Sequence, residues 1–228
     1  MNFLCHAIPY LDQPLLAIST GVPDWMSVVD RKVRARGKYA AQHVDSDDPA
    51  LAAVAGGILR HIADDRWFHG TAAFVETNLR LAVELRDRLP GDTGFRPMFV
   101  GHILIEMLLD SYWLRDDPSL GQRYYDAVSA ADAAVVQQSV VTITGKQVTG
   151  LSSVIQRFAD MKFLYDYRDH TKLLMRINQV MARVGLSQLP DSLVEWLASA
   201  DKLVESRRVQ MLTPPDGTDP FGFAKRAT

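Results

Sequence analysis

The sequence predicts an all-α protein, built as a single-domain bundle of helices. Long segments rich in Ala, Leu and Ile are separated by helix breakers, and no regular series of alternating strands is present. The G-x-G-x-x-G fingerprint, the phosphate-binding P-loop and the G-x-S-x-G elbow of α/β folds are absent. The 228 residues are 47% hydrophobic and 23% charged, as in ordinary globular proteins. This length is enough to bury a core.

The expected helices follow one another along most of the chain. The first begins after Asp47 or Asp48, either of which can cap it, with Pro49 in its first turn. A Pro-Gly segment at 89–94 and an Asp-Pro turn at 115–118 break the pattern. Residues 140–144 are expected as a short strand or a frayed helix end. The predicted helices cover residues 49–69, 71–88, 97–113, 119–140, 151–163, 167–184 and 190–210.

The domain is expected to span residues 1–212. Beyond the domain the composition changes: residues 213–220 contain three prolines and a glycine. This segment therefore cannot continue a helix. The sequence therefore predicts an extended C-terminal tail over 213–228.

The cysteine and histidine counts restrict the chemistry. With 1 Cys and 6 His, the chain excludes an internal disulfide, a zinc ribbon and a cysteine-ligated iron–sulfur cluster. Any bound metal must be held by imidazole nitrogens and carboxylate oxygens. We expect Cys5 to be buried and unreactive.

Charge and hydropathy exclude other classes. The net charge of −2 does not favour nucleic-acid binding. The first basic residue is Arg31, so the start of the chain lacks the positive region of a signal peptide. No apolar run reaches the roughly 18 residues of a membrane span. We therefore expect a cytoplasmic protein.

Two segments carry metal-ligating side chains at helical spacing. His61, Asp65 and His69 stand at positions i, i+4 and i+8 of one predicted helix. Each step of four residues rotates by only about 40° around a helix, so the three share a face. His102 and Glu106 repeat this spacing with Asp110, in a helix that is apolar nearly all round.

We call each set of three ligating side chains at i, i+4 and i+8 a ladder. The second ladder (His102, Glu106 and Asp110) is the more informative one, because its helix is expected to be buried. A helix that is apolar on every side is normally buried, and an unpaired buried carboxylate costs several kcal/mol. A metal ion, or a facing ladder of the same kind, would satisfy these groups. Borderline divalent metals accept imidazole and carboxylate together.

Other interpretations of the ladders stay open at this point. The first ladder can be a solvent-exposed face, and the second a hydrogen-bonded core network. A binuclear metal oxidase is disfavoured because such bundles use Glu-x-x-His motifs, which are absent. A non-catalytic helical interaction protein, with ladders that only stabilise its core, is a third alternative.

The N-terminal half resembles a known family. The chain opens Met-Asn-Phe-Leu-Cys-His, and Gly21 is followed by Asp24 and an aromatic residue. Residues 57–61 read Gly-Ile-Leu-Arg-His, with Asp65 four positions on, and a later block runs from His102 to Trp113. These motifs resemble the acyl carrier protein phosphodiesterases, also called holo-ACP hydrolases, over residues 1–115.

This resemblance implies a fold and an activity. The family is similar to the HD-domain phosphohydrolases, which are all-helical and metal-dependent. Its reaction hydrolyses the phosphodiester between 4′-phosphopantetheine and a serine of acyl carrier protein. The chain departs from the family at Ile62, which replaces an arginine, and at His69 and His102, which replace acidic residues. Both imidazoles keep the capacity to bind metal but shift its preference away from purely oxygen-loving ions.

The sequence and the resemblance together give a set of candidate residues. One or two divalent ions (Mn, Mg, Fe or Zn) are expected. Asp24, Asp65 and Glu106 are the candidate catalytic carboxylates. The segment 31–38 carries five positive charges and is a candidate phosphate clamp or dock for an acidic carrier protein, with Arg31, Arg34 and Arg168 as phosphate-binding candidates. The candidate metal ligands are His6, Asp24, His61, Asp65, His69, His102, Glu106 and Asp110.

Overall fold

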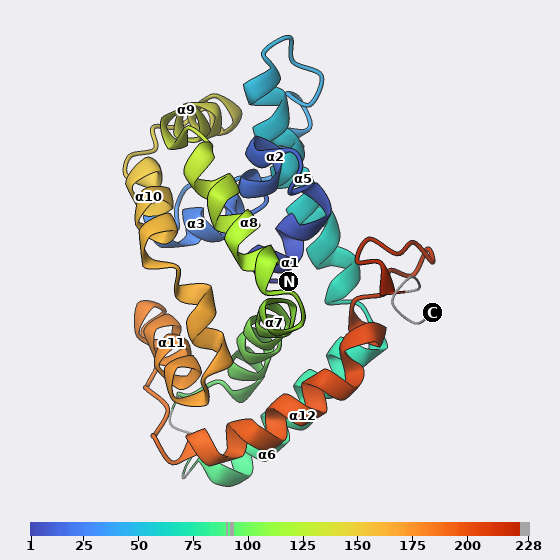
Figure 1. The fold of residues 1–228 in the computed structure, drawn as a ribbon. Helices are drawn as coiled ribbons and strands as arrows, with labels where there is room; N and C mark the ends of the chain where they lie inside the picture. Colours follow the sequence, from blue (N-terminus) through green and yellow to red (C-terminus); the bar gives the residue numbers. More distant parts are fainter. Residues whose placement is uncertain (90, 92–93, 224–228) are drawn as a thin grey trace. The chain divides into compact units, whose positions relative to one another are not determined.

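In the computed structural model, helices and the turns between them form the protein (Figure 1). The structure describes residues 1–89, 91 and 94–223, and no strand occurs in these ranges. The prediction of an all-α fold is confirmed. Within the same ranges, every helix is too short or too polar to cross a lipid bilayer.

Five short helical elements precede the first long helix, and longer helices follow. No helix was expected before residue 49, because these early helices are too short to show a helical period. In chain order the elements are α1 (Phe3–Ala7), η1 (Ile8–Tyr10), α2 (Pro14–Ser19), α3 (Val22–Val29), α4 (Gly37–Ala40), α5 (Pro49–Phe68), α6 (Ala72–Arg88), α7 (Pro97–Asp116), α8 (Pro118–Ala130), α9 (Ala133–Thr144), α10 (Leu151–Met161), η2 (Phe163–Arg168), α11 (His170–Arg183) and α12 (Leu193–Met211).

One predicted helix was wrong. The segment 119–140 is two helices, α8 and α9, and residues 140–144 belong to α9 rather than to a strand. The break lies at Asp132, whose carboxylate accepts hydrogen bonds from the backbone N–H groups of Ala134 and Val135. This N-cap satisfies the first amides of a new helix, which favours a restart over a continuous helix.

The chain divides into two compact units, which are described separately. The first unit contains residues 1–66 and 118–163. In it α10 contacts α3, α8 and α9, and α8 also contacts α1 and α2. Its core is rich in aromatic rings: Phe3 stacks on Trp25 and lies 4.8 Å from the ring of Phe158. These contacts fix α1, the helix that carries His6.

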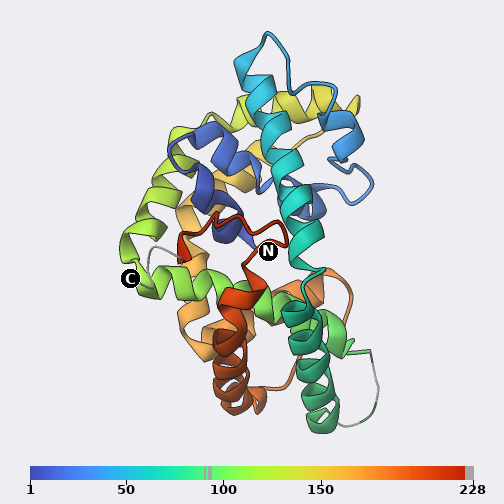
Figure 2. The ribbon, with the colours of Figure 1, turned by 90° about the vertical axis from the view of Figure 1, so that its right-hand side faces the viewer.

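The second unit contains residues 67–117 and 164–228. Its helices α6, α7 and α12 pack against one another, and α11 contacts α7 and α12. Figure 2 shows α6 and α12 running side by side. Polar contacts join the same helices: Trp196 Nε1 donates to Glu84 at 2.9 Å, and the Tyr112 hydroxyl donates to the Asp201 carboxylate at 2.7 Å.

The C-terminal segment folds back onto the second unit. Phe221 is buried, and the rings of Phe221 and Phe223 each stack on Trp113 at 5.5 Å. Residues 213–222 form no helix, as predicted for the tail, but aromatic packing holds the segment against α7. Residues 224–228 of the predicted tail, and residues 90, 92 and 93 of the predicted break, lie outside the described ranges.

A close approach in the first unit positions α5. A Cβ atom added to Gly57 would lie 2.5 Å from Ser19 Cβ and 2.8 Å from the backbone oxygen of Leu16, so only glycine fits here. Gly57 stands one turn before His61. The same contact that packs α5 against α2 therefore sets the position of His61.

Replacing Gly57→Ala is expected to destabilise the protein by about 1–3 kcal/mol, because backbone atoms of α2 would have to shift. The control is Gly56→Ala, whose added Cβ would meet only Leu16 Cδ1, at an ordinary 3.4 Å. That change should be neutral or stabilising by up to about 1 kcal/mol, as alanine is the better helix former. Chemical denaturation of the two variants measures the difference, and equal stabilities would contradict the packing described here.

Candidate metal centres

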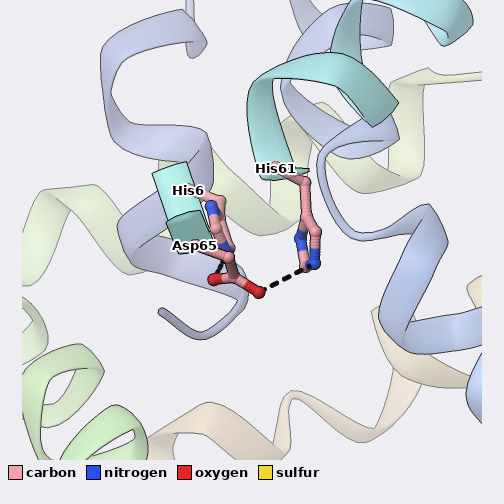
Figure 3. Close-up of side chains that lie close together, drawn as sticks. All are labelled: His6, His61 and Asp65. Atoms are coloured by element: carbon pink, nitrogen blue, oxygen red, sulfur yellow. Dashed lines mark ion pairs between the residues drawn. The ribbon is translucent and has the colours of Figure 1, made fainter. Parts of the chain in front are cut away.

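The first candidate centre lies in the first unit and consists of His6, His61 and Asp65 (Figure 3). His6 comes from α1, and the other two residues stand one turn apart on α5. One ligand atom from each lies within 4.8 Å of the others. His6 Nε2 is 3.3 Å from Asp65 Oδ1, and His61 Nε2 is 3.4 Å from Asp65 Oδ2. The two imidazole rings face each other at 4.3 Å.

A neighbouring carboxylate orients His6. His6 Nδ1 is 3.2 Å from Asp64 Oδ2, and its Nε2 is 3.0 Å from the backbone oxygen of Met1. The amino group of Met1 is 2.7 Å from Asp65 Oδ1. A carboxylate on the far nitrogen of a histidine is the usual support for a metal ligand, since it fixes the ring. To bind an ion, His6 would have to lose the proton on Nε2 and exchange the contact of this atom with Met1 for the ion.

Electrostatics in this centre follow from burial and hydrogen bonding. Burial alone would lower the pKa of His6, but hydrogen bonds to Asp64 and Asp65 outweigh it and raise the pKa to about 9. Burial likewise acts to raise the pKa of Asp65, yet hydrogen bonds from His6 and His61 hold it well below its usual range. Asp65 is therefore an ionised carboxylate at neutral pH.

One buried atom of the centre lacks a partner. His61 is 5% exposed, and its Nδ1 has no hydrogen-bond partner among the described residues. A buried polar atom of this kind costs about 1–3 kcal/mol. The Nε2 atom of His61 faces Asp65, while its Nδ1 is the buried nitrogen without a partner among the described residues.

The second candidate centre lies in the second unit and consists of His69, His102 and Glu106. His69 Nε2 and His102 Nε2 both approach the same oxygen, Glu106 Oε1, at 3.0 and 3.2 Å. Burial would raise the pKa of Glu106, but hydrogen bonds from His102 and His69 act against it and contribute to a lowered pKa. The carboxylate is ionised and faces two imidazoles.

The helical ladders do not stay together as triplets. His69 follows α5, which ends at Phe68, and groups with residues of α7 instead of with His61 and Asp65. Asp110 is fully buried in α7, whereas His102 and Glu106 are part-exposed. His69 leaves its ladder because α5 ends before it. Asp110 leaves the other ladder because two steps of about 40° rotate its side chain by about 80° from that of His102.

The remaining predicted residues lie outside both centres. Asp24 stands in the first turn of α3 and is half-buried. Arg31 and Arg34 are exposed on the segment between α3 and α4, and Arg168 is exposed at the end of η2. Neither group of candidate ligands found among the described residues includes any of these side chains.

The contact of Asp64 with His6 was not anticipated from the sequence. Asp64 does not fit the i, i+4 spacing that singles out Asp65, and together with Arg60 and Arg66 it suggested a charged surface face. Its role depends on α1, which is only five residues long and is separated from α5 by more than forty residues. No local sequence signal predicts that contact.

Both groups have the donor types and spacing of a metal site. A zinc ion bound at about 2.0–2.1 Å in tetrahedral geometry separates its ligand atoms by about 3.3 Å. The nitrogen–oxygen distances of 3.0–3.4 Å in the two groups are close to that value. With three protein ligands each, both groups leave a fourth position for water, as catalytic metal sites do.

Taken together, fold and sites define an all-helical protein with two His/carboxylate groups suited to a divalent metal. Comparisons with protein-family models, with curated proteins and with solved structures gave no match.

The charged state of His6 predicts a pH dependence of the metal-free protein. The folded pKa is raised above the unfolded value of 6.5, so this stabilisation is fully present below pH 6.5 and is lost as pH rises through about 9. The loss is on the order of 3 kcal/mol. Urea unfolding between pH 6 and 10 measures it, and His6→Gln should flatten the dependence. An unchanged slope in that variant would contradict the assignment.

Proposed function

We propose that this protein is a metal-dependent phosphodiester hydrolase whose ion is held by His6, His61 and Asp65. The observation that supports this most directly is the convergence of two imidazoles and an ionised carboxylate from α1 and α5, with Asp64 behind His6. The same three ligand residues belong to the motifs that resemble acyl carrier protein phosphodiesterases. An HD-domain-like fold and a cytoplasmic location are parts of this proposal.

The proposed chemistry follows from this donor set. A divalent ion held there would neutralise the charge of a phosphodiester and lower the pKa of bound water toward 7. Asp65 supplies the ionised oxygen, and Asp64 orients the His6 ring. The resemblance makes Asp24, a half-buried carboxylate in the first turn of α3, the proposed group that orients the water or accepts its proton.

The proposed substrate is the phosphodiester that joins 4′-phosphopantetheine to a carrier-protein serine. Carrier proteins of this kind are acidic partners, and the segment 31–38 offers exposed basic side chains that complement them. Arg31 and Arg34 are the proposed phosphate or carrier contacts in that segment. Arg168 is a further basic candidate, on η2.

Metal-loaded protein is expected to hydrolyse bis-p-nitrophenyl phosphate. His61→Ala and Asp65→Asn should each lower kcat/KM by at least about 100-fold, because each removes a proposed ligand of the ion. His43→Ala is the matched control, a half-buried histidine outside both groups, and should keep full activity. Metal-loaded, folded protein without turnover, or turnover that survives both ligand variants, would contradict the proposed function.

The substrate is tested separately with holo-acyl carrier protein. Release of 4′-phosphopantetheine, followed by mass spectrometry, is the expected result. A paired change, Arg31→Ala with Arg34→Ala, should raise KM for the carrier protein and leave hydrolysis of the small diester unchanged. If the small diester is cleaved and no carrier protein is, the reaction class stands and the carrier substrate is wrong.

A further inference from the structure

We infer that His69, His102 and Glu106 form a second metal site, which selects zinc or a similar borderline ion over magnesium. The site goes beyond the proposed activity and does not depend on it. All three residues belong to the second unit.

The distances between the ligand atoms of this group are close to those around a bound ion. Both histidines direct Nε2 at one oxygen of Glu106, at 3.0 and 3.2 Å. In the first centre, by contrast, the two histidines approach different oxygens of Asp65. The two nitrogens and the shared oxygen lie within 4.8 Å of one another, and the nitrogen–oxygen distances are those between neighbouring ligands of one tetrahedral ion.

Aromatic rings pack against the imidazoles of His69 and His102 and fix their positions. The ring of Phe74 lies 4.9 Å from the ring of His69 and meets the ring of His102 edge-on at 5.1 Å. The ring of Phe68 lies 5.1 Å from that of His69 and 4.8 Å from that of Phe74. Ligands whose rotamers are held by buried aromatic rings lose little freedom when an ion binds.

Helix packing fixes the backbone of the site. At Gly101, beside His102, an added Cβ atom would lie 2.5 Å from Asn78 Oδ1, so α6 and α7 are in close contact there. His69 precedes α6 by a short turn, in which Thr71 caps the helix by accepting from Phe74 N–H. His69, just before α6, and His102, on α7, are thus both attached to this pair of packed helices.

The donor types decide which ion is preferred. Magnesium favours six oxygen ligands and is reluctant to lose its water, whereas two imidazoles and one carboxylate suit zinc and its neighbours. The side chains of His69 and His102 are 29% and 35% exposed, and that of Glu106 is 16% exposed. An ion can therefore enter from solvent and keep water as its fourth ligand.

Zinc counting tests the second site without any assay of activity. Chelator-treated protein is equilibrated with micromolar zinc in millimolar magnesium and analysed for bound metal. Wild-type protein should hold two zinc ions per chain, and the near-isosteric variants Glu106→Gln and Asp65→Asn one each. Zinc affinity at the second site should fall more than about 100-fold in Glu106→Gln, as losses of outer-shell groups alone cost about 10- to 100-fold. His43→Ala should keep both ions.

Cobalt substitution assigns the remaining ion. In Asp65→Asn protein, cobalt should give the visible absorption of a four-coordinate site, and the further change Glu106→Gln should abolish it. Circular dichroism confirms that each variant is folded. The inference is overturned if folded Glu106→Gln protein keeps two zinc ions. It is also overturned if wild-type protein holds a single zinc ion and both Glu106→Gln and Asp65→Asn remove it. It is also overturned if magnesium displaces the zinc. Phosphodiester turnover is measured in a separate assay. Loss of turnover tests the proposed function, and the zinc count tests the second metal site.

Discussion

The ionised, partly buried carboxylate of Asp65 is the constraint around which the first centre is built. A carboxylate that is partly removed from water is stabilised in its ionised form by positive or hydrogen-bonding partners. Here the partners are His6, His61 and the amino group of Met1, which brings α1 onto α5. The close packing of Gly57 against α2 and the aromatic contacts of Phe3 hold these two helices in the positions that the carboxylate requires.

The two candidate centres use the same residue types in different surroundings. His6 is fully buried and supported by Asp64, which suits a centre whose electrostatics are set by the protein. His69 and His102 are part-exposed and bound by aromatic rings, which suits an ion that exchanges with solvent. The burial of His6 and its contact with Asp64, more than the types of ligand, distinguish the roles proposed for the two centres.

Much of the fold could be predicted because long helices leave a clear pattern. Helices α5, α6 and α7 begin within a residue of their predicted starts, while the break between α8 and α9 was missed because one capping aspartate decides it. Of the eight metal ligands predicted from the sequence, six fall into the two groups. It did not indicate how they divide, because that depends on where α5 ends and on how far a side chain rotates along α7. The contact of Asp64 with His6 required α1 to reach α5, which no local pattern reports.

The central claim is that Asp65, His6 and His61 bind one divalent ion. Crystals of the protein soaked in manganese, with anomalous diffraction recorded near the manganese edge, test it most directly. The account predicts an anomalous peak about 2.0–2.3 Å from a nitrogen of each histidine and an oxygen of Asp65. A fully soaked crystal with no peak there, and with the contacts of Asp65 to both histidines unchanged, would contradict it.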